Sequence, residues 1–183
     1  MALDAGSYRL GPQAGRLLLK TGRTGLGRRA GHDLTIEVTA WQADVVMNTG
    51  DPGQSSVTVT VDVDSVQIRE GTGGLKPLTD ADRADIKSTI SEKILLSAEH
   101  PVITFRSAQV TGTPDAFQIS GDLRIMGQTR PATVHGGIDA GRLSGHATIT
   151  QSRWGIKPYS AFAGALRLAD DIQVQFDLAL PAA

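Results

Sequence analysis

The chain has 183 residues, 40% of them hydrophobic and 20% charged, a composition typical of one globular domain. Its 18 basic and 19 acidic residues leave a formal net charge of -1, so no overall basic field favours nucleic acid as the main partner. Because cysteine is absent, the sequence excludes a disulfide framework, a thiolate nucleophile and a cysteine-ligated metal site.

Two further patterns concern membranes and export. No apolar run approaches the roughly 18 residues of a transmembrane helix. The first ten residues lack the basic and apolar regions of a signal peptide. We therefore expect a cytoplasmic protein with one domain over 1–183 and no transmembrane segment.

Alternation of apolar and polar residues predicts eight antiparallel strands. The pattern is clearest at 57–63, where every odd residue is Val. In chain order, the predicted strands cover 16–23, 32–41, 57–63, 102–110, 117–125, 129–138, 143–149 and 172–180. Segments rich in Gly, Pro and Asp separate several of them and predict turns.

One segment, between the third and fourth predicted strands, follows a helical period instead. Over 79–96, Ile86, Ile90 and Ile94 recur every four residues, which places them on one helical face. Thr79 and Asp82 resemble a capping box at the start of this helix. We predict that the helix covers the barrel or its opening with the three isoleucines, while Asp82, Lys87 and Glu92 are solvated.

The number and length of the strands favour an all-β, eight-stranded antiparallel barrel over a sandwich. Such a barrel is either filled by its own side chains or holds one small ligand. Gly121, Gly136, Gly145 and Ala147 fall on the inward face, where small residues would leave an aliphatic cavity suited to a hydrocarbon chain. The alternative is that these glycines mark bulges or corners.

The glycine-rich segment 25–31 carries Arg28 and Arg29. A dinucleotide site would need a helix after it, but the alternating pattern predicts a strand, so the fingerprint fails. Together with Arg23, these arginines either bind an anionic group at the barrel mouth or form a solvated cluster.

The four histidines lie at no metal-ligand spacing, and only His32, beside Asp33, has a neighbouring carboxylate of interest. That pair either carries chemistry or simply begins a strand. No catalytic constellation is visible, so we predict a protein that is not an enzyme and needs no metal or cofactor.

Aromatic residues gather in 153–168, where Trp154, Tyr159 and Phe162 alternate with Gly and Pro. This mixture predicts an irregular loop over the barrel mouth, with a buried Trp154 ring whose N–H needs a partner. The loop either lines the opening of a cavity or plugs one barrel end.

Several short motifs resemble, in order, those of the YceI-like family. They are Tyr8-Arg-Leu-Gly-Pro12, the strand at 56–65, His100-Pro101-Val102-Ile103-Thr104-Phe105, the segments 119–127 and 129–132, and Ser152-Arg153-Trp154-Gly155-Ile156 followed by 170–176. The resemblance implies a lipocalin-like barrel with a helix between the third and fourth strands. It also implies binding of a polyisoprenoid or similar lipid, without established catalysis. The chain departs from the family at 71–77, where a glycine-rich segment replaces an Arg-Asp-x-His-Leu motif, and in lacking the leader that many relatives carry.

The leading hypothesis is a carrier that holds an isoprenoid-type or fatty-chain lipid in the barrel, as a monomer or a homodimer. The residues expected to contact the ligand are Arg28, Arg29, His32, Ile90, Phe105, Phe117, Trp154, Tyr159 and Phe162. One alternative is an enzyme or sensor that acts on a small hydrophobic molecule through His32 and Asp33. Another is an interaction module whose interior is filled.

Overall fold

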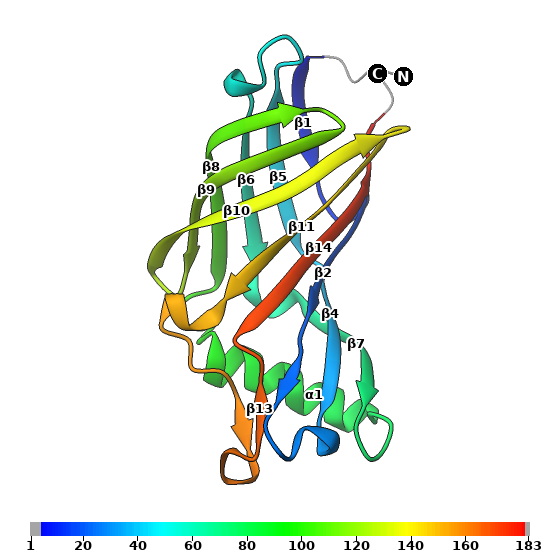
Figure 1. Ribbon diagram of the computed structural model, residues 1–183, viewed down its shortest axis with the longest axis vertical. Coiled ribbons are helices and arrows are strands. Elements are labelled where there is room, and N and C mark those ends of the chain that lie inside the picture. Colours follow the sequence, from blue (N-terminus) through cyan, green and yellow to red (C-terminus); the bar gives the residue numbers. More distant parts are fainter. Residues whose placement is uncertain (1–4, 182–183) are drawn as a thin grey trace.

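The architecture is a strongly curled antiparallel sheet with one helix across its lower end (Figure 1). The computed structural model describes residues 5–181, so the first four and last two positions of the predicted domain lie outside the described residues. The strands are β1 (Gly6–Leu10), β2 (Gly15–Lys20), β3 (Arg23–Thr24), β4 (His32–Val38), β5 (Trp41–Met47), β6 (Ser56–Asp62), β7 (Val66–Gly73), β8 (Val102–Thr113), β9 (Ala116–Ile125), β10 (Gln128–Asp139), β11 (Arg142–Thr150), β12 (Ser160–Ala161), β13 (Leu166–Leu168) and β14 (Asp171–Ala179). The α-helix is α1 (Asp80–Ser88), which continues as a π-helix over Thr89–Ile94.

The main sheet contains eleven strands in the order β1-β5-β6-β8-β9-β10-β11-β14-β2-β4-β7. All of its pairings are antiparallel, as the alternating sequence predicted. Val57, Val59, Val61 and Val63 point toward the apolar interior, whereas Thr60 and Asp62 are exposed. The period-two pattern therefore identified the inward face correctly.

The count of eleven differs from the eight strands predicted, and bends in the chain explain the difference. β1, β5 and β7 were not predicted as separate strands. The chain runs from β1 into β2, from β4 into β5 and from β6 into β7 through breaks at 11–14, 39–40 and 63–65. The two strands on either side of such a break pair with different strands: β1 pairs with β5, whereas β2 pairs with β4. The predicted strand 32–41 is thus wrong at Thr39, where the chain bends and a second strand begins.

The inward glycines do not supply empty volume, which corrects the expectation drawn from them. Gly136 lies opposite Phe117, and Gly145 lies opposite Phe176, across the β9–β10 and β11–β14 ladders. A Cβ at either glycine would overlap the neighbouring phenyl ring. Gly121 faces a shift of register in β8, where the backbone of Arg106 would meet a Cβ. Gly121 therefore lies at a bulge, as the alternative held, whereas Gly136 and Gly145 allow the close approach of phenyl rings.

The helix confirms the predicted position and cap. The Thr79 hydroxyl accepts from the Asp82 backbone N–H, and the Asp82 carboxylate accepts from the Thr79 N–H, which completes a capping box. Ile86 and Ile90 pack against the sheet cluster formed by Leu34, Ile36, Val66 and Ile68, and Ile94 packs against a neighbouring cluster. Asp82 and Glu92 are exposed, whereas Lys87 is partly buried. Within residues 5–181, no helix has the length and apolar character needed to span a membrane.

A second, three-stranded sheet forms at the lower end in Figure 1, below the main sheet. It joins β12, β13 and β3, so that the end of the aromatic segment 153–168 pairs with the chain just before the glycine-rich segment 25–31. We call this lower end, where α1 lies, the helix end. The opposite end carries the β5–β6, β8–β9 and β10–β11 turns, and we call it the hairpin end (Figure 1).

Candidate functional site

A cavity of about 660 Å³ lies inside the curled sheet. Its wall is built mostly from aliphatic side chains that alternate inward along the strands, such as Leu17, Val59, Val134 and Val174. Ala147 on β11 is buried and contributes to the same wall. The volume lies within the range of about 300–1,000 Å³ that is usual for ligand sites. An apolar cavity of this kind excludes water and favours apolar ligands.

The polar residues of the wall lie toward its two ends. Arg23 and Asp85 are the only residues with a formal charge among the described residues that line the cavity, and both belong to the helix end. At the hairpin end the polar lining residues are uncharged, namely Asn48, Thr49, Ser55, Ser56 and Thr113. A long ligand with one polar head would therefore meet charged groups only at the helix end.

Arg23 organises the helix end of the cavity. Its guanidinium donates to both carboxylate oxygens of Asp33, at 2.8 and 3.2 Å, and to the backbone carbonyls of Arg28 and Gly31. Because the carboxylate of Asp33 is held by Arg23, it does not orient the imidazole of His32 in this structure. The predicted His32–Asp33 pair is thus divided between two different contacts.

His32 instead makes contact with the glycine-rich segment that departs from the family pattern. Its Nε2 lies 2.7 Å from the carbonyl oxygen of Lys76, a distance that fits an imidazole N–H donating to that carbonyl. Gly74 has a φ of +73°, and a Cβ there would overlap the His32 ring. The segment 71–77 is therefore shaped to pack closely on His32 and Arg23 at the cavity mouth.

The structure divides the nine predicted contact residues into two groups. Five of them line the cavity: His32, Ile90, Phe105, Phe117 and Tyr159. The remaining four, Arg28, Arg29, Trp154 and Phe162, lie outside the lining. Arg28, Arg29 and Phe162 are exposed at the helix end because their loops extend beyond the cavity wall.

Trp154 lies behind the wall rather than at an opening. Its side chain is 2% exposed, and its indole N–H donates to the Leu123 carbonyl at 3.0 Å. The buried ring and the partnered N–H were predicted; the position at the cavity mouth was not confirmed, because the turn at Gln151–Trp154 packs this ring against β9. Ile156, two residues later, lines the cavity.

Trp41 is one of the lining residues that sequence reasoning missed. It is buried at the start of β5 and lines the cavity, and its indole N–H has no hydrogen-bond partner within residues 5–181. A buried donor without a partner costs about 1–3 kcal/mol. The alternation of Trp41, Ala43, Val45 and Met47 could have identified this inward face, but the strand had been predicted to end at Trp41.

Comparisons with known proteins agree with this architecture. The family model described as YceI-like domain matches residues 15–180. No curated protein matches the chain. Among solved structures, BcnA of Burkholderia cenocepacia is 16% identical, with a TM-score of 0.64, and the alignment covers 90% of this chain and 96% of that one. The YceI protein of Campylobacter jejuni is 12% identical, with a TM-score of 0.59, covering 81% of this chain and 84% of that one. At such identities the likeness concerns the fold.

Proposed function

This chain belongs to the YceI-like family, and from that premise we propose that it is a carrier for an isoprenoid-type or other long-chain amphiphilic lipid. The observation that carries the proposal is the aliphatic cavity of about 660 Å³ inside the sheet. The hydrocarbon tail would lie along this wall. The polar head would lie at the helix end, near Arg23, His32 and Tyr159.

Burial of the tail supplies a large favourable free energy that does not depend on a polar anchor. Each buried CH₂ group contributes about 0.8 kcal/mol, so about ten of them contribute ~8 kcal/mol. That gross value corresponds to roughly micromolar binding before the costs of ordering the ligand are subtracted. A branched isoprenoid longer than ten carbons would bury more apolar surface and bind more tightly.

The proposal predicts that a large side chain placed inside the cavity competes with the lipid. Ala147 is 6% exposed and lines the cavity, so Ala147→Phe fills space that the tail would occupy. We expect binding of geranylgeraniol, measured by calorimetric titration, to weaken at least about tenfold, since several CH₂ groups lose their place.

The matched control is Ser144→Phe, which adds the same ring to the same strand at an exposed position on its outer face. This variant should bind like the unaltered protein. Native mass spectrometry of protein purified from its own host provides an independent test, because a co-purifying long-chain lipid is expected. Equal affinity of all three proteins, with no lipid retained, would contradict the carrier function.

A further inference from the structure

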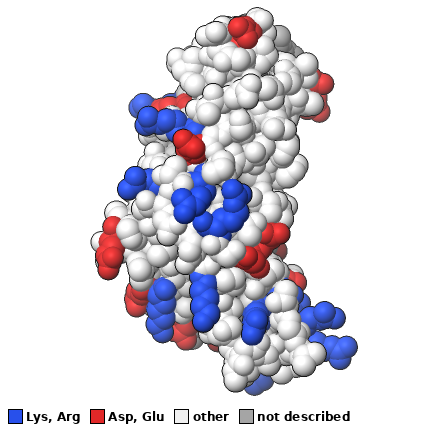
Figure 2. Space-filling view, turned by 60° about the vertical axis from the view of Figure 1, so that its left-hand side comes forward, with Lys and Arg blue, Asp and Glu red and all other residues white. Residues whose placement is uncertain are grey.

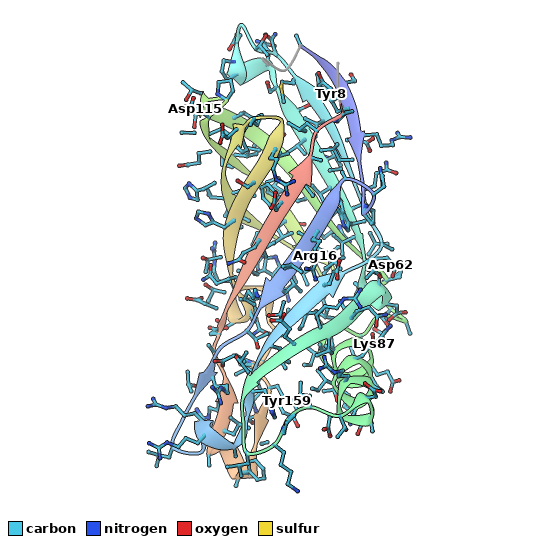
Figure 3. The ribbon with its side chains drawn as sticks, turned by 90° about the vertical axis from the view of Figure 1, so that its right-hand side faces the viewer. Tyr8, Arg16, Asp62, Lys87, Asp115 and Tyr159 are labelled. Atoms are coloured by element: carbon cyan, nitrogen blue, oxygen red, sulfur yellow. The ribbon has the colours of Figure 1, made fainter. Side chains whose placement is uncertain are left out.

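Three connecting segments form one surface at the helix end, and we name it the loop surface. It comprises residues 24–31, 71–79 and 157–168. The Gly27 N–H donates to the Ala165 carbonyl at 2.9 Å, and β13 pairs with β3, which joins the first and third segments. The contact between His32 and the Lys76 carbonyl fixes the second segment beside the first. In Figure 1 these loops extend below α1, and Figure 3 places Tyr159 at the same end.

Most of the exposed large apolar side chains belong to this surface. Six such side chains are exposed among the described residues, and four of them are Leu26, Leu75, Tyr159 and Phe162. Leu26 is fully exposed, and Leu75 and Phe162 are 80% and 68% exposed. Phe162, Ala163 and Gly164 all have positive φ, a turn that holds the phenyl ring outward. Apolar residues clustered at loop tips indicate an interaction surface rather than isolated exposure.

The charge of the loop surface has one sign. Its three segments contain Arg28, Arg29, Lys76, Lys157 and Arg167 and no acidic residue. All five basic residues are exposed. Figure 2 shows a largely white lower end from which blue side chains project. Acidic residues of α1 border this surface on one side, because Asp82 and Asp85 line a small pocket together with Leu75 and Lys76.

The turns of the hairpin end have the opposite charge. Its turns at 48–55, 113–116 and 139–141 contain Asp51, Asp115 and Asp139 and no basic residue. Figure 3 places Asp115 at the end opposite Tyr159. The connecting segments at the two ends therefore differ in charge, with only basic residues in the loop surface and only acidic residues in the hairpin-end turns. An anionic surface would orient such a molecule with the loop surface facing it.

We infer that the loop surface docks on an anionic lipid bilayer. Leu26, Leu75 and Phe162 would enter the interface between head groups and acyl chains, while the surrounding Arg and Lys side chains would contact lipid phosphates. The same segments supply Gly31, Tyr159 and Leu166 to the cavity lining, so docking would bring the cavity mouth to the membrane. This inference goes beyond the proposed function, since docking requires no bound cargo.

Vesicle co-sedimentation of the full chain tests the inference. We expect binding to vesicles made of equal amounts of phosphatidylglycerol and phosphatidylcholine, and much weaker binding to phosphatidylcholine alone. The double variant Arg28→Gln/Arg29→Gln should weaken the first affinity roughly thirtyfold, which corresponds to ~1 kcal/mol for each basic residue. Leu26→Ser/Phe162→Ser should weaken it roughly tenfold or more, because two apolar side chains no longer insert.

The matched controls remove side chains of the same types at positions outside the loop surface. Arg124→Gln/Arg130→Gln changes the net charge equally at exposed positions on β9 and β10, and Val102→Ser removes an exposed apolar side chain outside the loop surface. Both should bind vesicles normally. Geranylgeraniol binding without vesicles is measured on every variant, so that a failure of cargo binding is distinguished from a failure of docking.

Three outcomes would overturn the inference. The first is an absence of binding to the anionic vesicles, and the second is an equal loss in the control variants. The third is self-association, detected by analytical ultracentrifugation, that disappears in Leu26→Ser/Phe162→Ser while vesicles remain unbound. That result would assign the loop surface to a second copy of the chain. Cargo binding could persist in each of these cases.

Discussion

The two buried tryptophans have different surroundings, since Trp154 ends the turn Gln151–Trp154 and Trp41 begins β5. Trp154 has a protein partner for its N–H and lies behind the cavity wall. Trp41 lines the cavity, and no described residue accepts from its N–H. A ligand in the cavity would therefore change the surroundings of Trp41 and leave those of Trp154 almost unchanged.

This difference gives a prediction at the residue scale. In Trp154→Phe, the remaining Trp41 emission should shift and change intensity when geranylgeraniol is added. In Trp41→Phe, the remaining Trp154 emission should stay constant although the lipid still binds. The chain contains only these two tryptophans, so each variant reports one site. A response from Trp154 with none from Trp41 would mean that the ligand lies outside this cavity.

Among the elements, the helix shows how the interval between apolar residues determines which side chains face the sheet. An α-helix has 3.6 residues per turn, so a repeat of four drifts around its axis. The π-helix at Thr89–Ile94, with the Leu95 N–H donating to the Ile90 carbonyl at 2.9 Å, adds a wider turn. The wider turn offsets the drift, which explains how Ile86, Ile90 and Ile94 all face the sheet.

Strand β4 is tied to both of its neighbours by one carboxylate. Glu37 on β4 accepts from Arg69 on β7 at 2.6 Å and from Arg16 on β2 at 3.2 Å. Partial burial raises the pKa of Glu37, but the hydrogen bonds and positive charges of Arg69 and Arg16 outweigh it, so the pKa lies below its usual range. A carboxyl with a lowered pKa in the folded state stabilises the fold when ionised.

We predict that Glu37→Gln lowers the free energy of unfolding at neutral pH by about 1 kcal/mol, a modest value because both arginines are partly exposed. Since the folded-state pKa is lowered, the contribution is complete above the unfolded-state pKa. It is lost as the pH falls below about 4. Urea unfolding of the unaltered protein and of Glu37→Gln, at neutral pH and near pH 3, measures the difference in their free energies of unfolding. The expected result is a difference that shrinks in acid; a difference that stays constant would mean that Glu37 acts through packing alone.

The same elements show what could and could not be predicted from the sequence. Strands with long, regular alternation, such as β9 and β14, were found because period two is a local property. β1 and β7 were missed because each contributes only two inward apolar residues before glycine interrupts it. β5 was missed because the preceding strand was extended across the bend at Thr39. The prediction of empty volume beside Gly136 and Gly145 was wrong because phenyl rings from the neighbouring strands fill that space.

For the whole molecule, the net charge of -1 conceals a difference between the connecting segments of its two ends. The loop surface collects basic residues from three segments that are far apart in the sequence, and only the topology of the sheet brings them to one end. Sequence reasoning placed Arg28, Arg29 and Phe162 at the barrel mouth as ligand contacts, whereas all three lie outside the cavity lining. The distinction between lining a cavity and surrounding its mouth depends on how far each loop extends beyond the strands.

A cavity that holds a ligand in the folded state alone also affects the stability of the whole molecule. A ligand at about one hundred times its Kd stabilises the folded state by ~2.7 kcal/mol, provided that it does not bind the unfolded chain. For a domain of this size, each kcal/mol raises Tm by roughly 2–4 °C. We therefore predict that saturating geranylgeraniol raises Tm by about 5–10 °C, measured by differential scanning calorimetry.

The cavity variants determine whether that rise comes from the interior. Ala147→Phe should lose most of the ligand-induced rise in Tm, because its ring occupies the tail site, whereas Ser144→Phe should keep all of it. The ring of Ala147→Phe enters apolar space instead of a packed core, so the ligand-free variant should remain as stable as the unaltered protein or become more stable. A ligand-free Ala147→Phe that unfolds at a much lower temperature would mean that the ring cannot be accommodated and that the cavity is smaller than 660 Å³. An equal ligand-induced rise in both variants would place the ligand on the outer surface of the sheet.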